Sequence, residues 1–552
     1  MRIIKYKELI LILFLSLIIN FSTINTFPVL DRDEARYVQS TKQMLETGNY
    51  NSIKFKDDLR SKKPIGIYWL QSISVNLFSF KKKTDYSDKK LNDIWKYRFI
   101  SSLFSLFSCL ALFFLATKVF DRKTAFYSSL TLQCTLLFVI ESHIAKTDAV
   151  LLTCSICSML LLMGYYKGIF IKKFDYIFLA FWCSLGFSIM IKGPVLLLII
   201  LVTTIFIMLI KKKVKWVHAT NPLIGFFILL LIIIPWFLSI PSVEQSSFIS
   251  EGLKKDFLDK MIGAQESHGA FFGAHTIAIL VLFFPMSLFL IPSIQKSIKG
   301  YSSENIFFLI AWILPNLIIL ELVPTKLPHY TLPLYPGLAL LVGSNIASQK
   351  SLIINGKQIY NNLNFLLYII IITVLVYVIF IAMRDYSSIL QDYKYVAFFT
   401  YLVFLVPIFK VIRINKVRSF YYQVFLGCIT SIFIFGFLLP KLDRIWISKE
   451  IYNIINTDNK EFKSSTIATI GYNEPSLIFL LGTKTAVLKS LKEDFFEKNI
   501  YNYIIVEKKY LPDFIKIIKN SKYKYFLLNE LKGFNMAKGK WVNTSIFKLR
   551  EE

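Results

Sequence analysis

The chain is poor in charged residues, and acidic residues are especially scarce. Only 18% of its 552 residues are charged, with 36 Asp and Glu against 64 Lys and Arg, whereas soluble domains carry about 25% charged residues. Hydrophobic residues make up 55% of the chain and include 51 Phe. Disordered chains lack such aromatic and aliphatic content. The composition therefore excludes a soluble or disordered protein and predicts an integral membrane protein.

Several motifs are also missing. No GxGxxG or P-loop pattern occurs, and no basic patch lies on a soluble motif, so we expect neither a nucleotide site nor a nucleic-acid partner. The net charge of +28 comes from short clusters between apolar runs, as in loops facing anionic lipids. No cysteine lies outside an apolar segment, which argues against an extramembrane disulfide framework. The six are Cys109, Cys134, Cys154, Cys157, Cys183 and Cys428.

Apolar runs long enough to cross a bilayer recur along the first 440 residues. The first run lacks a small-residue cleavage pattern, so we interpret it as an uncleaved anchor and not as a signal peptide. The sequence predicts about thirteen transmembrane helices, near residues 9–29, 98–117, 124–142, 148–166, 175–191, 194–210, 221–240, 274–293, 304–323, 330–348, 363–383, 394–412 and 420–439.

The loops between these runs alternate in Lys and Arg content, which sets orientation by the positive-inside rule. We expect a cytoplasmic N-terminus, a transmembrane domain over residues 1–440, and an extracytoplasmic first loop at about 30–97. Thirteen crossings place the tail, residues 441–552, outside. There, strand-like runs at 466–472, 485–488, 501–506, 523–529 and 541–549 alternate with helix-like stretches, which predicts a small periplasmic α/β domain.

The first outside loop opens with an unusual polar string. Asp31 and Glu34 have the spacing of a helix capping box. Asp33, Arg36 and Tyr37 stand at i, i+3 and i+4 and therefore share one helix face. A cap does not require a carboxylate, a guanidinium and a phenol on that face, so these three residues are candidates for a site.

Basic and aromatic residues mark the other outside loops. Lys63 and Tyr68, on either side of the Pro64 turn, are two of these candidates. Lys63 either faces solvent or meets a phosphate near a helix N-terminus, and Tyr68 also suits the membrane interface. Snorkelling explains a single charge at a span end, but Lys192 and Lys326 place positive charge on the side that orientation rules disfavour. The candidates in these short loops are Asp148, Lys192, Lys326, His329 and Tyr330.

The loop at 241–273 carries Glu266 and His268, two residues apart. They are weak candidates for a divalent cation, because two possible ligands do not make a site. A hydrogen-bonded pair is the favoured explanation of these two residues, and a solvated loop is the other alternative. No cofactor is required by the remaining motifs.

Taken together, these strings resemble a known group of bacterial membrane glycosyltransferases. They are D-E-x-R-Y, K-P-x-x-x-Y-W, K-T-D-A-V-L-L, K-G-P and T-K-L-P-H-Y-x-L-P-x-Y-P, in this order. The group contains 4-amino-4-deoxy-L-arabinose transferases and protein mannosyltransferases and has the GT-C fold. Lys62 departs from the aminoarabinose transferases, which usually have Glu there, and this weakens the case for that donor and for a metal site built with that Glu.

The resemblance implies a polytopic enzyme that transfers a sugar from a polyprenyl-phosphate donor. The acceptor would be lipid A or another envelope molecule, at the periplasmic face of the inner membrane. By resemblance Asp33 matches a catalytic aspartate and Asp148 a second carboxylate. Glu34, Arg36, Tyr37 and Lys63 match neighbours of the donor phosphate. A polytopic transporter or lipid flippase is the alternative; thirteen spans are excessive for a scaffold that anchors a partner-binding tail.

Overall fold

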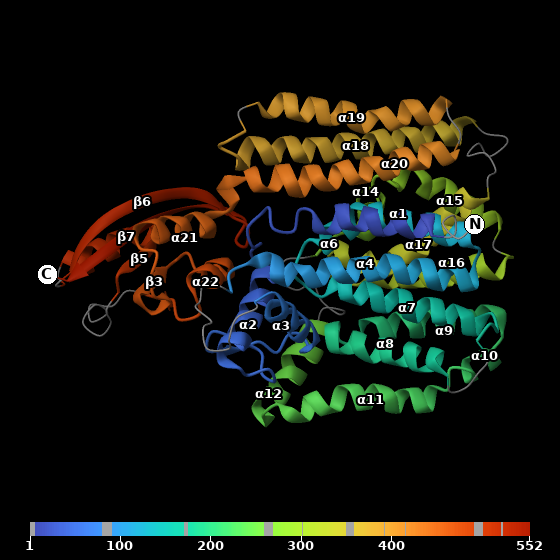
Figure 1. Cartoon of the computed structure of the whole chain (residues 1–552), viewed down its shortest axis with the longest axis horizontal. Coiled ribbons are helices and arrows are strands. Elements are labelled where there is room, and N and C mark those ends of the chain that lie inside the picture. Colours follow the sequence, from blue (N-terminus) through green and yellow to red (C-terminus); the bar gives the residue numbers. More distant parts are fainter. Residues whose placement is uncertain are drawn as a thin grey trace.

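The computed structural model describes residues 6–79, 91–170, 175–258, 269–300, 302–348, 358–390, 392–413, 416–490, 501–519, 521 and 523–551. A helical bundle carries a smaller C-terminal sheet domain at one end (Figure 1). The helices in the first half of the chain, in the bundle and in its connecting loops, are α1 Lys7–Ser16, α2 Asp33–Thr47, α3 Gly66–Phe78, α4 Ile94–Val119, α5 Arg122–Cys134, α6 Leu136–Ser142, α7 Asp148–Tyr166, α8 Tyr176–Lys192, α9 Val195–Lys211, α10 Lys215–His218, α11 Pro222–Ser239 and α12 Ser242–Ser247.

The second half of the bundle is also helical. Its helices are α14 Ala274–Leu282, α15 Ser287–Lys299, α16 Glu304–Leu322, α17 Tyr335–Ala347, α18 Gln358–Tyr386, α19 Tyr393–Arg413 and α20 Lys416–Ser431. More widely or tightly wound turns extend some of them, at Leu17–Phe21, Phe248–Leu258, Pro328–Leu334 and Ile432–Leu438.

Each of the thirteen predicted membrane segments contains helix, but thirteen spans are not confirmed. Within the described residues, six helices are long and apolar enough to cross a membrane, or seven if α5 and α6, bent by 67°, count as one span. Others are shorter or broken: α8 and α9 have 17 residues each, and the predicted segment 274–293 divides into α14 and α15. Irregular backbone of this kind persists at membrane depth only where protein covers it.

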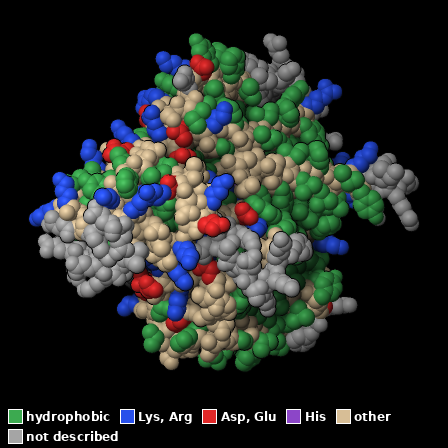
Figure 2. All heavy atoms as spheres, turned by 60° about the vertical axis from the view of Figure 1, so that its left-hand side comes forward, with side chains coloured by type: hydrophobic (Ala, Val, Ile, Leu, Met, Phe, Trp, Pro, Cys, Tyr) green, Lys and Arg blue, Asp and Glu red, His purple; other side chains and the backbone are tan. Residues whose placement is uncertain are grey.

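The bundle buries its polar centre and turns its apolar flank outward. Helix α7 packs between α4 and α8, and α17 packs against α5. Gly343 of α17 allows close approach, because a Cβ there would lie 2.1 Å from Ser128 Oγ; small residues serve this purpose between membrane helices. Hydrophobic side chains cover the flank, while Lys and Arg gather around the end that carries the sheet domain (Figure 2).

The C-terminal domain contains the strands β3 Ile467–Ile470, β4 Ala486–Leu488, β5 Tyr503–Glu507, β6 Tyr523–Asn535 and β7 Lys540–Glu551, and the helices α21 Ile447–Asp458, α22 Pro475–Leu481 and α24 Leu511–Lys519. The strands form one sheet in the order β4-β3-β5-β7-β6. Strands β4, β3 and β5 are parallel, and β5, β7 and β6 are antiparallel. Helix α21 packs on one face and α24 on the other. The five strands predicted from the sequence are confirmed as β3 to β7.

The first loop lies between the bundle and the sheet domain (Figure 1). It consists of α2, the short hairpin β1 Lys54–Phe55 and β2 Asp58–Leu59, and α3. Helix α2 packs against α3 and against α22 of the C-terminal domain. The loop is thus held from both sides.

Candidate functional site

Helix α2 presents its predicted polar face to a cavity of about 320 Å³. Asp33, Arg36 and Tyr37 all line this cavity, as expected for positions i, i+3 and i+4. Asp33 is exposed, whereas Tyr37 is buried. Within the described part of the chain Asp33 accepts no hydrogen bond, so its carboxylate remains available to a ligand in the cavity.

The cavity is strongly basic. It gathers the beginning of α2, the loop before α3, the loop before α7, the end of α8 and the turn after α16, which are far apart in sequence. Its seven cationic and two acidic side chains are Arg32, Arg36, Arg60, Lys62, Lys63, Lys146 and Lys192, and Asp33 and Asp148. Besides Tyr37, the uncharged part of the lining consists of Thr147, Leu327, His329, Tyr330 and Ala537. An excess of positive charge in a confined space favours a phosphate-bearing ligand.

Asp148 is held by lysines on both sides. Lys192 Nζ lies 2.6 Å from Asp148 Oδ1, and Lys146 Nζ lies 3.8 Å from Oδ2. Lys146 also pairs with Glu141, at 2.9 Å. The Asp148 side chain is only 3% exposed. Because its charge is already compensated, Asp148 is arranged to position Lys192 and Lys146 and not to take up a proton.

The loop groups around this network have fixed protonation states at neutral pH. Burial lowers the pKa of Lys146, but the carboxylates of Glu141 and Asp148 outweigh it, so the pKa is raised overall and the ammonium stays charged. Burial and the positive charge of Lys146 lower the pKa of His329 well below its usual value, which leaves the imidazole neutral. Burial also raises the pKa of Tyr37 well above its usual value.

The polar cavity continues into an apolar groove of about 150 Å³. Lys62, Lys63, Lys192, His329 and Tyr330 line both spaces and therefore mark their junction. Apart from Asn316 and two glycines, the rest of the lining is apolar and includes Leu151, Val195, Leu198, Ile319, Leu320 and Val323. A ligand with a charged head and a long apolar tail fits this arrangement, because each part meets a surface of its own polarity.

The turn between α8 and α9 supplies the lysine at this junction. Lys192 is the last residue of α8, and Gly193 follows with φ +75° and ψ −158°. Only glycine adopts this region without strain. The turn aims Lys192 at Asp148 and places its ammonium 5.6 Å from the centre of the Tyr330 ring.

Glu34 lies outside the cavity lining, although the resemblance implies a place near the donor phosphate. It is 1% exposed and binds Arg98 through both carboxylate oxygens, each at 2.8 Å. Its oxygens also accept hydrogen bonds from the backbone amides of Leu30 and Ala145, both at 2.8 Å. Glu34 therefore ties the start of α2 to α4 and to the loop that carries Lys146.

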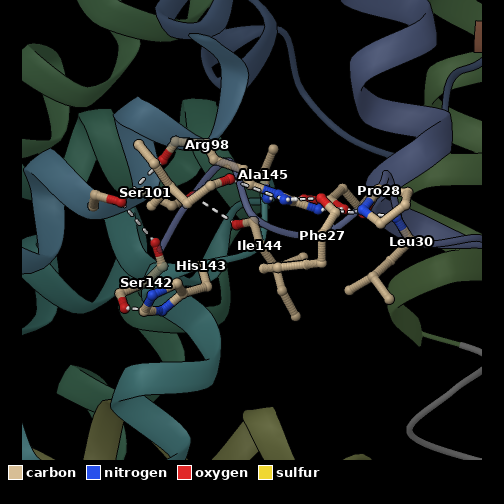
Figure 3. A network of polar contacts seen from close by, with 12 residues as sticks. Phe27, Pro28, Leu30, Arg98, Ser101, Ser142, His143, Ile144 and Ala145 are labelled. Carbon is tan, nitrogen blue, oxygen red and sulfur yellow. Dashed lines mark hydrogen bonds and ion pairs between the residues drawn. The ribbon is translucent and has the colours of Figure 1, made fainter. Parts of the chain in front are cut away.

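Arg98 extends this anchor into the preceding loop. Its guanidinium donates to the carbonyls of Ile24, Phe27 and Pro28 at 2.8–3.0 Å and stacks 3.7 Å from the centre of the Phe27 ring. Ser101, on the next turn of α4, binds the Ile144 carbonyl (Figure 3). The network therefore fixes the two loops that flank the cavity.

Two further candidates also lie outside the cavity lining. Tyr68 is buried against Tyr37, with its hydroxyl 3.3 Å from the Arg60 guanidinium. Lys326 donates to the carbonyls of Glu321 and Val323, which close the end of α16. Glu266 and His268 lie outside the described residues, and within the described part no group of three His, Cys, Asp or Glu could hold a metal.

The predicted capping role of Asp31 is wrong. Helix α2 begins at Asp33 with Arg32 at the cap position, where no side chain caps the helix. Asp31 instead accepts a hydrogen bond from the Ser476 amide of the C-terminal domain, at 3.1 Å. This long-range partner takes up the carboxylate that a local cap would have used.

Sequence reasoning did not single out Arg32, Arg60 or Ala537 as cavity residues. The basic character of the 60–63 segment is visible in the sequence and points to Arg60 as a candidate. Arg32 has φ +67°, and its guanidinium reaches the Ala537 carbonyl 2.7 Å away. Ala537 has no chemical signature in sequence, because only the docking of the C-terminal domain brings it to the cavity.

Comparisons with known proteins agree with this architecture. Residues 62–238 match the family model described as dolichyl-phosphate-mannose-protein mannosyltransferase. The undecaprenyl phosphate-alpha-4-amino-4-deoxy-L-arabinose arabinosyl transferase of Wigglesworthia glossinidia brevipalpis is 24% identical over 91% of this chain and 80% of its own length. The same-named protein of Enterobacter sp. (strain 638) is 24% identical over 62% of this chain and 61% of its own length.

The fold comparison extends over nearly the whole chain. ArnT from Cupriavidus metallidurans, solved bound to undecaprenyl phosphate, superposes with a TM-score of 0.72 at 13% identity and 98% coverage of both chains. The chain spans less than two thirds of the length of several of its curated relatives, 61% in the Enterobacter case. The protein thus has the fold of the GT-C membrane glycosyltransferases and is similar in sequence to their aminoarabinose transferase and protein mannosyltransferase group.

Proposed function

We propose that this protein is a glycosyltransferase that moves a sugar from a polyprenyl-phosphate donor to a lipid A-type or other envelope acceptor. The observation that carries the proposal is the junction of the basic cavity with the apolar groove at Lys62, Lys63 and Lys192. The prenyl tail occupies the groove, the phosphate meets the lysines, and the sugar enters the cavity. The resemblance of the relatives named above supports the same chemistry.

The reaction breaks the bond between the anomeric carbon of the sugar and the phosphate oxygen. The bonding electrons leave with the polyprenyl phosphate, and a nucleophilic oxygen of the acceptor forms the new bond to that carbon. Lys63 and Lys192 stabilise the negative charge on the leaving phosphate, since cations fixed in a confined site need no reorganisation. No soluble nucleotide is needed.

Asp33 faces the developing positive charge on the anomeric carbon. For a hydroxyl acceptor, its carboxylate takes the departing proton. For a phosphate acceptor, which is already deprotonated, Asp33 orients the group and stabilises the oxocarbenium-like carbon. Asp148 keeps Lys192 and Lys146 in place. In this proposal no step passes through a metal.

We place the reaction at the periplasmic face of the inner membrane. The Lys and Arg content of the loops supports thirteen crossings from a cytoplasmic N-terminus. In that topology the first loop, the cavity and the C-terminal domain, residues 441–552, share the outer side. A transporter would need ionisable or broken-helix sites near the middle of the membrane. The lining of this cavity includes the start of α2 and the loop before α3, and α2 and α3 lie at the end of the bundle beside the sheet domain (Figure 1).

The test compares envelope lipids, glycans and proteins by mass spectrometry in cells with and without the gene. A sugar increment that disappears on deletion and returns with the wild-type chain identifies both sugar and acceptor. Asp33→Asn should fail to restore the increment while inserting at normal levels. Asp57→Asn, an exposed carboxylate of the same loop, is the matched control and should restore it. Full restoration by Asp33→Asn would remove Asp33 from this role.

A further inference from the structure

The C-terminal domain contributes to the cavity through the tip of the β6–β7 hairpin, residues 535–540. Ala537 at this tip lines the polar cavity. The Ala537 carbonyl accepts a hydrogen bond from the Arg32 guanidinium, at 2.7 Å, and Arg32 immediately precedes Asp33 in the chain. A residue more than 500 positions away in sequence thus lies beside the proposed reaction centre.

Contacts within the C-terminal domain hold the hairpin tip in place. Asn535, 2% exposed, donates to the Glu474 carboxylate at 2.7 Å, and Glu474 is 3% exposed. Lys538 bonds back to the Asn535 side chain through its amide and to the Gly471 carbonyl through its ammonium, at 2.9 and 3.1 Å. The Asn535–Glu474 bond is buried, and a buried polar pair of this kind makes the structure around it rigid.

The domain that carries the tip is in turn fixed to the first loop. The buried Lys42 ammonium of α2 donates to the Phe479 carbonyl of α22 at 3.0 Å. Lys56 donates to the Thr485 carbonyl at 2.6 Å, and Asp31 accepts from the Ser476 amide at 3.1 Å. These three bonds join the C-terminal domain to the first loop, so the domain that carries the tip cannot move away from α2 without breaking them.

The tip also lies on a particular side of the cavity. The residues shared with the apolar groove come from the loop before α3, the end of α8 and the turn after α16. Ala537, Arg32 and Asp33 line the cavity and not the groove. The tip therefore bounds the part of the cavity that a prenyl tail does not reach.

We propose that the β6–β7 hairpin tip is the acceptor-side wall of the cavity and limits the size of the acceptor group that reaches Asp33. The inference rests on the proposed function, and it assigns to the C-terminal domain a part in acceptor selection. A second opening, about 290 Å³ in volume, lies between the β1–β2 hairpin and Glu251 and meets the cavity at Arg36, Arg60 and Lys62. It is the competing route for the acceptor.

The test replaces Ala537, an uncharged residue of the hairpin tip, with a larger side chain. Ala537→Trp should reduce the sugar increment in complemented cells about tenfold or more, because a small displacement of one reactant costs that much. Binding of undecaprenyl phosphate to the purified full chain should stay unchanged. Asn543→Trp introduces the same side chain at an exposed position of β7 outside the cavity. It is the control and should transfer the sugar as the wild type does.

Two results for Ala537→Trp would overturn the proposal about the hairpin tip. Full transfer by Ala537→Trp would overturn the proposal and favour the opening beside Glu251. Loss of undecaprenyl phosphate binding would also overturn it, since the tip would then act on the donor. If wild type and Asp33→Asn both lack any increment, the proposed function itself fails, and that outcome is distinct from the two before it.

Discussion

Asp33 and Glu34 are adjacent in the chain, but their carboxylates lie in different environments. Asp33 is exposed to the cavity and accepts no hydrogen bond from the described residues, whereas Glu34 is buried and fully paired. Successive helical positions point about 100° apart, so one carboxylate is available for a ligand while its neighbour builds the frame. The spacing in the sequence predicts the first of these roles. The second depends on Arg98, which is 64 residues away.

The Glu34–Arg98 pair should be essential for stability. Glu34→Ala leaves a buried guanidinium without its counter-charge, and removing one partner of a buried ion pair costs about 3–5 kcal/mol. We expect a lower thermal midpoint for the detergent-solubilised protein, measured by fluorescence-detected size exclusion. The double variant Glu34→Leu with Arg98→Met, which removes both charges, should recover part of the loss. Equal loss in both variants would argue against an electrostatic cause.

At the scale of elements, short helices and turns form the site, and long spans support it. The loop before α3, the end of α8 and the turn after α16 each bring one or two side chains to the junction of cavity and groove. Lysine–glycine–proline between two apolar runs predicts a turn in the sequence. It does not reveal that the lysine of this turn pairs with Asp148.

The α8–α9 turn offers a test of how strictly this geometry is set. Gly193→Ala should lower the free energy of unfolding by about 1–3 kcal/mol, because its φ and ψ lie in a region essentially restricted to glycine. Gly300→Ala is the control, since Gly300 has φ −101° and its added Cβ would meet nothing closer than 3.5 Å. The thermal midpoints of the two variants give the comparison. Indistinguishable midpoints would contradict the argument from strain.

For the whole molecule, the decisive contact is the docking of the C-terminal domain on the first loop. Asp31 lies at this contact beside Ser476 and Glu474. Burial, reinforced by the negative charge of Glu474, raises its pKa from 3.8 to about 7. Between pH about 4 and pH about 7, Asp31 is therefore protonated in the folded protein and ionised in the unfolded chain.

The raised pKa of Asp31 makes the stability of the protein depend on pH. Because the folded state holds the extra proton, the contribution of Asp31 to stability falls as pH rises from about 4 to about 7. Asp31→Asn should remove that slope when thermal midpoints are measured across this range. Asp57→Asn, an exposed carboxylate elsewhere in the loop, should retain it. An unchanged slope in Asp31→Asn would assign the effect to another group.

Composition, apolar periodicity and local motif spacing were enough to determine the membrane class, the thirteen helical segments, the five strands of the tail and the shared face of Asp33, Arg36 and Tyr37. These features depend on neighbours within a few residues. The breaks within the predicted spans, the burial of Glu34, the pairing of Asp31 and the position of Ala537 at the cavity were decided by tertiary structure. Each depends on a partner at least 60 residues away or on how helices bend and pack, and such partners leave no periodic trace in sequence.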